Sequence, residues 1–138
     1  MKEDVLSQNT QDSFLYLSIT NSKFLKACRS TVKPEYFSSE ITENLIRICY
    51  NYLDQFNTNP DTHFHDEVCR FLNNKDEKEK ERYVQYLERI QVIEKPNVAY
   101  VISRISKFVQ AREFEAAAIN FVKLTEKTSD LLQTFLIS

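Results

Sequence analysis

The side chains best suited to chemistry lie together in the short segment 63–69, which reads HFHDEVC. His63 and His65 are the only two histidines of the chain. On a helix, residues i and i+2 point about 200° apart, so only His65 and Cys69, at i and i+4, could bind one metal ion. Two ligands do not complete a site unless others arrive from elsewhere in the fold. The sequence therefore favours capping or partly exposed histidines at a helix start, and it predicts no metal-binding residues.

Nucleotide binding through a phosphate loop is excluded by composition, because the chain contains no glycine. Both the G-x-x-x-x-G-K-[ST] loop and the G-x-G-x-x-G turn need glycine where the backbone approaches phosphate. The G-x-S-x-G motif of serine hydrolases is missing for the same reason. We therefore predict no catalytic residues and no cofactor-binding residues. A small helical enzyme that uses His63 or His65 is kept as a less favoured hypothesis, since a site assembled from distant residues leaves no local motif.

The cysteines and the amino terminus indicate a compartment. Cys28, Cys49 and Cys69 are spaced about twenty residues apart without a C-x-x-C pair, which is typical of reduced, buried thiols in a cytosolic protein. The first residues, MKEDVLSQNTQDS, lack the apolar core of a signal peptide, and no apolar run approaches the ~18 residues of a membrane span. We expect a cytoplasmic protein that makes no membrane contact.

Charge gives little reason to expect nucleic-acid binding. The formal net charge is −2 and the pI is near 5.7. Arg104 and Lys107 are near neighbours on one helix face, and Lys123 and Lys127 form a second pair, but acidic residues lie close to both pairs. We interpret these residues as solvated helix faces and expect any DNA contact to be secondary.

Composition and patterning predict an all-α fold. A chain with 42% hydrophobic and 28% charged residues is typical of a globular domain, and the lack of glycine removes the easiest hairpin turns. We expect a compact helical domain of about five helices followed by a C-terminal helical hairpin. In residue numbers, this is a flexible N-terminus at 1–11, a globular helical domain at 12–95 and a hairpin for self-association at 96–138.

Caps and apolar spacing indicate where the helices begin. A first short helix starts at Asp12, and Asn21 caps a second. Segment 31–37, TVKPEYF, is expected to form a turn, because the residue before a proline is pushed toward extended geometry. After Ser38 or Ser39 as the N-cap, one helix face carries Ile41, Leu45, Ile48, Cys49, Tyr52, Leu53 and Phe56.

The middle of the chain alternates a second amphipathic helix with a charged segment. Pro60 is well placed to open that helix, and its apolar stripe is Phe64, Val68, Phe71 and Leu72. Segment 73–82, NNKDEKEKER, carries both signs of charge and is interpreted as a solvated helix surface or the loop that leads into it.

The carboxyl-terminal segment carries more apolar surface than it can bury alone. Asn97 is expected to cap a helix that continues to about Lys127, either as one long helix or as a hairpin of two, with a break and a new cap at 128–130. Phe114, Phe121 and Phe135 are apolar residues that a lone hairpin would leave exposed, which predicts a partner surface.

The order and lengths of these segments resemble the N-terminal domain of DnaB-type replicative helicases. In that family, two short helices lead to a P-[ED]-x-F turn, an amphipathic helix, a polar connection, another helix and a helical hairpin opened by an Asn-containing cap. The similarity runs from Phe14 to about Leu132, with Pro34, Glu35 and Phe37 in the turn. KPNVAYVISRISKFVQAREFEAAAINFVKL resembles the hairpin. The family usually has a glycine after its third helix, where this chain has 57–59, NTN; asparagine tolerates the same left-handed backbone.

The resemblance implies a non-catalytic assembly and docking domain. In the family, hairpins pair into dimers, the dimers form the collar of a hexamer, and the collar docks primase or loading proteins. The motor domain that uses ATP and Mg²⁺ is a separate unit, so this domain needs no cofactor. The alternative is a stand-alone phage or plasmid protein of the same fold that modulates a helicase. Interface candidates are Val101, Ile105, Phe108, Arg112, Phe114 and Phe121; Pro34 and Phe37 are structural markers, with Phe37 expected in the core.

Overall fold

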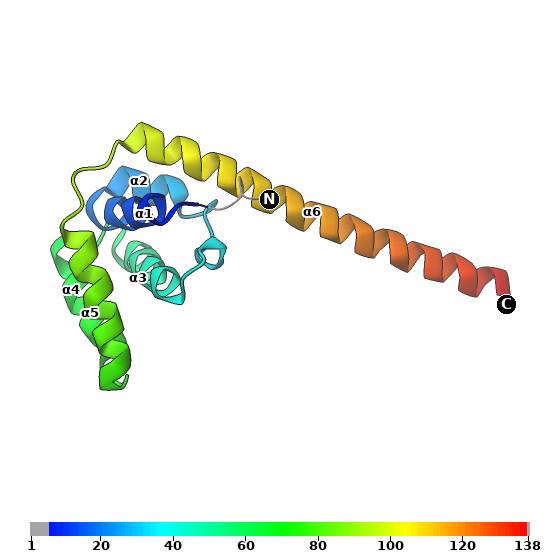
Figure 1. Cartoon of the computed structure of the whole chain (residues 1–138). Helices are drawn as coiled ribbons and strands as arrows, with labels where there is room; N and C mark the ends of the chain where they lie inside the picture. Colours follow the sequence, from blue (N-terminus) through cyan, green and yellow to red (C-terminus); the bar gives the residue numbers. More distant parts are fainter. Residues whose placement is uncertain (1–5, 138) are drawn as a thin grey trace.

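Six α-helices and two short 3-10 helices form the described part of the chain, which covers the backbone of residues 6–137 and the side chains of residues 6–127. Figure 1 shows their arrangement in a computed structural model. In chain order they are α1 (Gln8–Thr20), α2 (Ser22–Cys28), η2 (Pro34–Tyr36), α3 (Glu40–Phe56), η3 (Asp61–His63), α4 (Phe64–Leu72), α5 (Glu77–Gln91) and α6 (Val98–Ile137). The all-α prediction is confirmed, and no strand occurs in these residues.

Side chains that accept a backbone N–H fix where the helices begin. Asn21 Oδ1 accepts from Phe24 N at 3.0 Å, and Asn97 Oδ1 accepts from Tyr100 N at 3.1 Å. Ser39 is the cap of α3, as one of the two predicted serines. Such caps satisfy N–H groups that have no partner inside the helix. The predicted starts of α2, α3 and α6 are therefore confirmed.

The amino-terminal boundary differs from the expectation of a flexible segment at 1–11. Ser7 Oγ accepts from Thr10 N at 3.1 Å, and α1 begins at Gln8, four residues before Asp12. Gln11 is buried and donates its side-chain N–H to the carbonyl of Leu6 at 3.1 Å. Polar residues at 7–11 therefore cap and anchor α1. A prediction based on the spacing of apolar residues does not detect them. Residues 1–5 lie outside the described residues.

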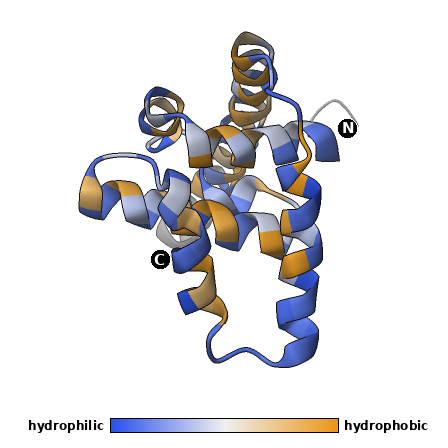
Figure 2. Cartoon of the chain, turned by 90° about the vertical axis from the view of Figure 1, so that its left-hand side faces the viewer, coloured by the Kyte–Doolittle hydropathy of each residue, from blue (hydrophilic) through white to orange (hydrophobic). Residues whose placement is uncertain are grey.

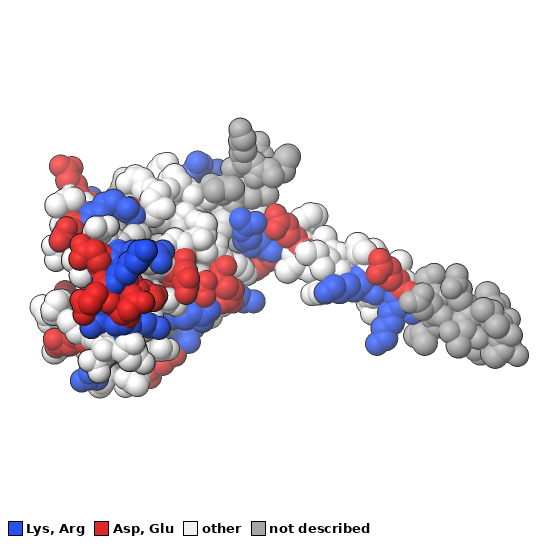
Figure 3. Space-filling model, turned by 60° about the horizontal axis from the view of Figure 1, so that its bottom comes forward, with Lys and Arg blue, Asp and Glu red and all other residues white. Residues whose placement is uncertain are grey.

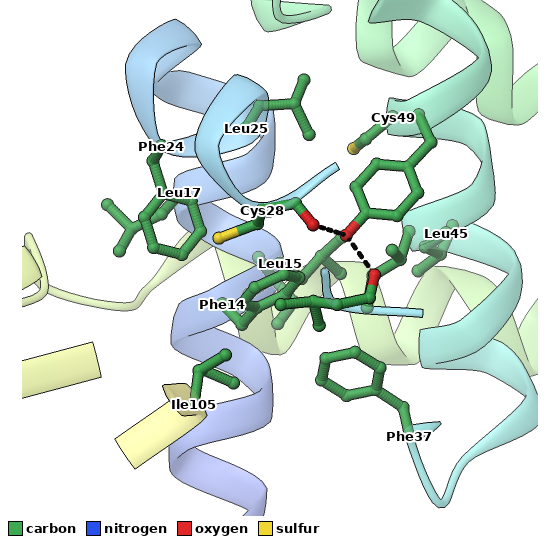
Figure 4. Packing of buried hydrophobic residues seen from close by; sticks show 14 of the residues in the cluster. Phe14, Leu15, Leu17, Phe24, Leu25, Cys28, Phe37, Leu45, Cys49 and Ile105 are labelled. Carbon is green, nitrogen blue, oxygen red and sulfur yellow. Dashed lines mark hydrogen bonds between the residues drawn. The ribbon is translucent and has the colours of Figure 1, made fainter. Parts of the chain in front are cut away.

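Phe37 fills the centre of the core, between α1 and α3. Its ring lies 5.1 Å from that of Phe14, which also meets Phe24 edge to face at 5.2 Å (Figure 4). Only 5% of Phe37 is exposed, so its predicted packing role is confirmed. Pro34 opens η2, whose single turn places the backbone of Phe37 at this junction.

The bounds of α3 agree with the prediction, but its buried face is rotated. Ile46 and Tyr50 are buried, whereas Phe56 is 58% exposed. Tyr50 is accommodated because its hydroxyl donates to the carbonyl of Val32 at 2.6 Å, and the carbonyl of Cys28 lies 3.3 Å from the same hydroxyl oxygen. A tyrosine with a satisfied hydroxyl packs as a large apolar group, and spacing alone does not reveal those partners.

The connection after α3 relies on asparagine where glycine is the usual choice. Asn57 has φ 58° and ψ 29°, the left-handed region, and its N–H bonds to the carbonyl of Leu53 at 2.7 Å. Asparagine is among the few residues that adopt this geometry routinely. The chain then turns into η3 and α4, after Pro60 as predicted.

Helices α4 and α5 form a hairpin that projects from the remaining helices, and a hydrophilic loop closes its far end (Figure 2). Val68 and Leu72 of α4 and Tyr83 of α5 are buried, and the Tyr83 ring meets that of Phe71 of α4 with centroids 5.6 Å apart. Asp76 caps α5, so the charged run at 73–82 is the loop and the first turns of α5, as predicted.

A buried carboxylate ties α1 to α5. Asp12 accepts hydrogen bonds from the Tyr86 hydroxyl at 2.9 Å, from Arg89 Nε at 3.0 Å and from Gln8 Nε2 at 2.7 Å. Because Tyr86 donates its one proton to Asp12, the 2.8 Å contact between Thr42 Oγ1 and the Tyr86 oxygen must have Thr42 as the donor. One network therefore joins α1, α3 and α5.

The predicted C-terminal hairpin is replaced by one helix, α6, which runs through the expected break at 128–130. No proline or glycine occurs after Pro96, and EFEAAA at 113–118 is rich in strong helix formers. Residue types that can cap a helix occur at Thr128, Ser129 and Asp130. Their helix propensity is only mildly unfavourable, so the helix continues through them.

We predict that Asp12→Asn lowers the free energy of unfolding by about 1.5–3 kcal/mol, the usual contribution of hydrogen bonds to a charged group. The measurement is urea denaturation at pH 7, followed by circular dichroism. The matched control is Asp54→Asn, which removes an exposed carboxylate paired with Arg29 at 2.8 Å and should change little. Equal losses in the two variants would contradict a special role for the buried network.

Candidate interaction surface

The first three turns of α6 belong to the core of the chain. Val101, Ile105, Phe108 and Val109 are buried, and this part of α6 packs against α1. Phe108 also meets Tyr36 edge to face, with ring centroids 6.2 Å apart. Apolar residues at i, i+4, i+7 and i+8 form one stripe, and here that stripe is covered by the rest of the chain.

The following turns of α6 leave the other helices, and Figure 1 shows them extending well beyond the rest of the molecule. Every residue from Glu113 to Lys127 is exposed. Phe114 is 76% exposed and Phe121 is 70% exposed. The other large exposed hydrophobic residues on this segment are Ile119, Val122 and Leu124. We call residues 112–127 the distal segment of α6.

Five of the six predicted interface residues therefore divide into two groups, and Arg112 lies between them. Val101, Ile105 and Phe108, which headed the prediction, are buried in the chain's own core, so the expectation that they form a pairing surface is corrected. Phe114 and Phe121 are exposed as an interface requires. The periodic pattern identified the apolar face of the helix, but it did not show which turns of that face another helix of the same chain would cover.

Arg112 marks the boundary between the buried and exposed turns. Its guanidinium lies 4.7 Å from the centroid of the Phe108 ring and pairs with Glu115 at 3.2 Å. The guanidinium packs over the Phe108 ring, the last buried aromatic ring on α6, and its positive charge lies at the start of the distal segment. The side chain of Phe135, the third exposed phenylalanine of the prediction, lies outside the described residues.

The exposed apolar residues of the distal segment follow a heptad spacing. Phe114, Ala117, Phe121 and Leu124 are separated by three, four and three residues. In an α-helix this spacing forms a narrow seam, the geometry by which two helices pack side by side. Leu124 was not among the predicted interface residues, although its position three residues after Phe121 would have identified it.

Charges flank this seam without forming a surface of one sign. Lys123 and Lys127 are exposed beside Glu126, and Figure 3 shows basic and acidic atoms interleaved over the visible face of the molecule. Arg104 and Lys107 are likewise exposed, as expected of a solvated face. Such a mixture suits pairing between protein helices better than contact with a uniformly anionic polymer.

The two histidines lie at the start of α4 and are exposed. His63 stacks on Tyr52, with ring centroids 6.2 Å apart, and its Nδ1 is 3.9 Å from Asp66. His65 borders a mostly apolar groove of about 240 Å³, lined by Tyr16, Ile19, Phe64, Leu87 and Ile90 among others. Its Nε2 lies 3.6 Å from Cys69 Sγ, so the predicted i, i+4 proximity is found.

Comparison with known proteins adds no relative, since no protein-family model, no curated protein and no solved structure matches this chain. Among the described residues, no helix has an apolar stretch long enough to cross a bilayer.

We predict opposite effects for two phenylalanines on α6. Phe108→Ala should lower the free energy of unfolding by about 3–5 kcal/mol, because it empties a buried ring site. Phe114→Ala should change it by less than about 0.5 kcal/mol, because the ring is exposed. Urea denaturation of both variants at low protein concentration, where chains do not associate, is the measurement. A large loss for Phe114→Ala would contradict the exposed distal segment.

Proposed function

We propose that this protein is a non-catalytic assembly and docking module that binds partner chains through the distal segment of α6. The observation that carries this proposal is the exposed seam of Phe114, Ala117, Phe121 and Leu124, which lies away from the core on a long helix. Apolar groups of this size are unfavourable in water, and a helix with little tertiary packing is only marginally stable. A partner helix would remove both penalties.

The first partner we propose is a second copy of the chain. In a symmetric dimer each subunit offers the same patch, so a seam on one helix packs against the identical seam of the other. Phe121 lies seven residues after Phe114, so both rings fall on one side of the helix, two turns apart. Lys123, Glu126 and Lys127 provide both signs of charge beside the seam, which allows opposite charges to meet across the pair.

The specific module we propose is the N-terminal domain of a DnaB-type replicative helicase. The support is the order of the first segments: two short helices, a Pro34-to-Phe37 turn packed into the core, and an amphipathic helix ended by a left-handed Asn57. The final segment begins at the expected Asn97 cap but is a single helix where the family has a hairpin. In this role the domain would contribute to a hexamer collar and dock primase or a helicase loader in the cytoplasm. ATP hydrolysis would belong to a separate motor domain.

The alternative within the same fold is a stand-alone protein that binds a helicase and modulates it. Both versions require the same exposed seam, so the seam does not separate them. The discriminating observation is whether the reading frame continues beyond Ser138 into a glycine-bearing phosphate loop. Continuation supports the helicase domain, and a stop codon supports the stand-alone protein.

We predict that the chain self-associates and that Phe114→Ser/Phe121→Ser abolishes association while helicity at low concentration stays unchanged. Light scattering across the micromolar range measures the first, and circular dichroism measures the second. Phe56→Ser is the matched control, since Phe56 is an exposed phenylalanine on α3, away from the seam, and its change should leave the dimer intact. A strict monomer at high micromolar concentration would contradict self-pairing, and capture of primase by the wild type but not the double variant would then favour a different partner helix.

A further inference from the structure

The outer face of α4 carries a thiol and an imidazole that lie side by side. Cys69 Sγ is 3.6 Å from His65 Nε2, and both residues are exposed. They sit one helical turn apart, while the opposite face of α4 buries Phe64, Val68 and Leu72. The backbone that holds the pair is therefore fixed by the core. The distal segment of α6 does not include these residues, so the proposed assembly role leaves them unexplained.

The distance between Cys69 Sγ and His65 Nε2 matches the distance between two ligand atoms bound to one tetrahedral metal ion. Zinc binds thiolate sulfur at about 2.3 Å and imidazole nitrogen at about 2.0–2.1 Å. With a tetrahedral angle between the bonds, the sulfur and the nitrogen would stand about 3.5–3.6 Å apart. The 3.6 Å found here is that distance, so the two atoms already have the spacing that such a chelate needs.

The remaining thiols and the second histidine have different surroundings. Cys28 and Cys49 are buried, and burial raises the pKa of the Cys28 thiol to about 11 and that of Cys49 further. A thiol must lose its proton to bind a metal, so these two are unsuited to the task. His63 is directed elsewhere, against Tyr52 and Asp66.

We propose that His65 and Cys69 form a two-ligand chelate for a thiophilic divalent cation of the Zn²⁺ type. His65 binds through Nε2 and keeps its proton on Nδ1, and Cys69 binds as the thiolate, so one proton is released for each ion bound. Among the described residues there is no group of three or more metal-binding side chains, so the chain supplies two positions. The other two tetrahedral positions are taken by water or by the same pair of a second copy.

The test is a titration of the untagged, reduced protein with Co²⁺, followed by calorimetry with Zn²⁺. A thiolate ligand gives a sulfur-to-cobalt charge-transfer band, and Zn²⁺ should displace the cobalt. Either His65→Ala or Cys69→Ser should weaken binding by more than about tenfold, because even changes outside the ligand shell cost about 10–100-fold. His63→Ala is the matched control, since it removes the neighbouring histidine and should leave the affinity unchanged.

The number of ions bound per chain and the metal affinities of the variants test the proposal. One ion per chain indicates water at the open positions, and one ion per two chains indicates a second copy; both results require His65 and Cys69 together. Absence of the charge-transfer band at 100 µM Co²⁺ would overturn the proposal, as would an equal loss of affinity in His63→Ala. Circular dichroism of each variant establishes that the fold is retained. Because α4 and the distal segment of α6 are separate, Phe114→Ser/Phe121→Ser should bind the metal normally whether or not the assembly role holds.

Discussion

The arrangement of the helices depends on one buried carboxylate. Asp12 would be costly in the interior without partners, and it is accommodated because Tyr86, Arg89 and Gln8 donate to it. Arg89 also lies over the Tyr86 ring at 4.6 Å, which keeps the cation beside the carboxylate. An apolar contact tolerates sliding, whereas this network has directional bonds and fixes α5 relative to α1. The proximal turns of α6 pack on the same α1, so the direction in which α6 leaves the molecule rests on that helix too.

Helix α6 divides into a part that belongs to the core and a part that does not. Up to Val109 the apolar face of α6 contributes to the core, and beyond Arg112 the apolar residues are exposed. A substitution in the distal segment therefore leaves the body's packing intact, and a substitution at Phe108 does not. At about 1.5 Å per residue, a helix of 40 residues is about 60 Å long, so the proposed partner at the distal end would be held well away from α3 and α5.

Local features of the fold could be predicted from sequence, and relations between distant elements could not. The caps Asn21, Ser39 and Asn97, and the burial of Phe37, follow from rules that act over a few residues. The Asp12–Tyr86 bond joins residues 74 positions apart, and neither residue type signals the other. The same limit applies to the candidate surface. Spacing identified Phe114 and Phe121 together with Phe108, but only the folded positions of other segments, Tyr36 of η2 among them, show that Phe108 is covered.

The lack of glycine links these observations. The two residues with positive φ among those described, Asn57 and Asp61, both lie in the connection between α3 and α4, where the chain must turn sharply without glycine. Elsewhere the helices are joined by extended residues or end in ordinary turns. After Asn97 no residue breaks the helix, so excess apolar surface is carried outward along α6 instead of being folded back. The apolar seam on the distal segment is therefore left exposed, and this exposure is the basis of the assembly role proposed for α6.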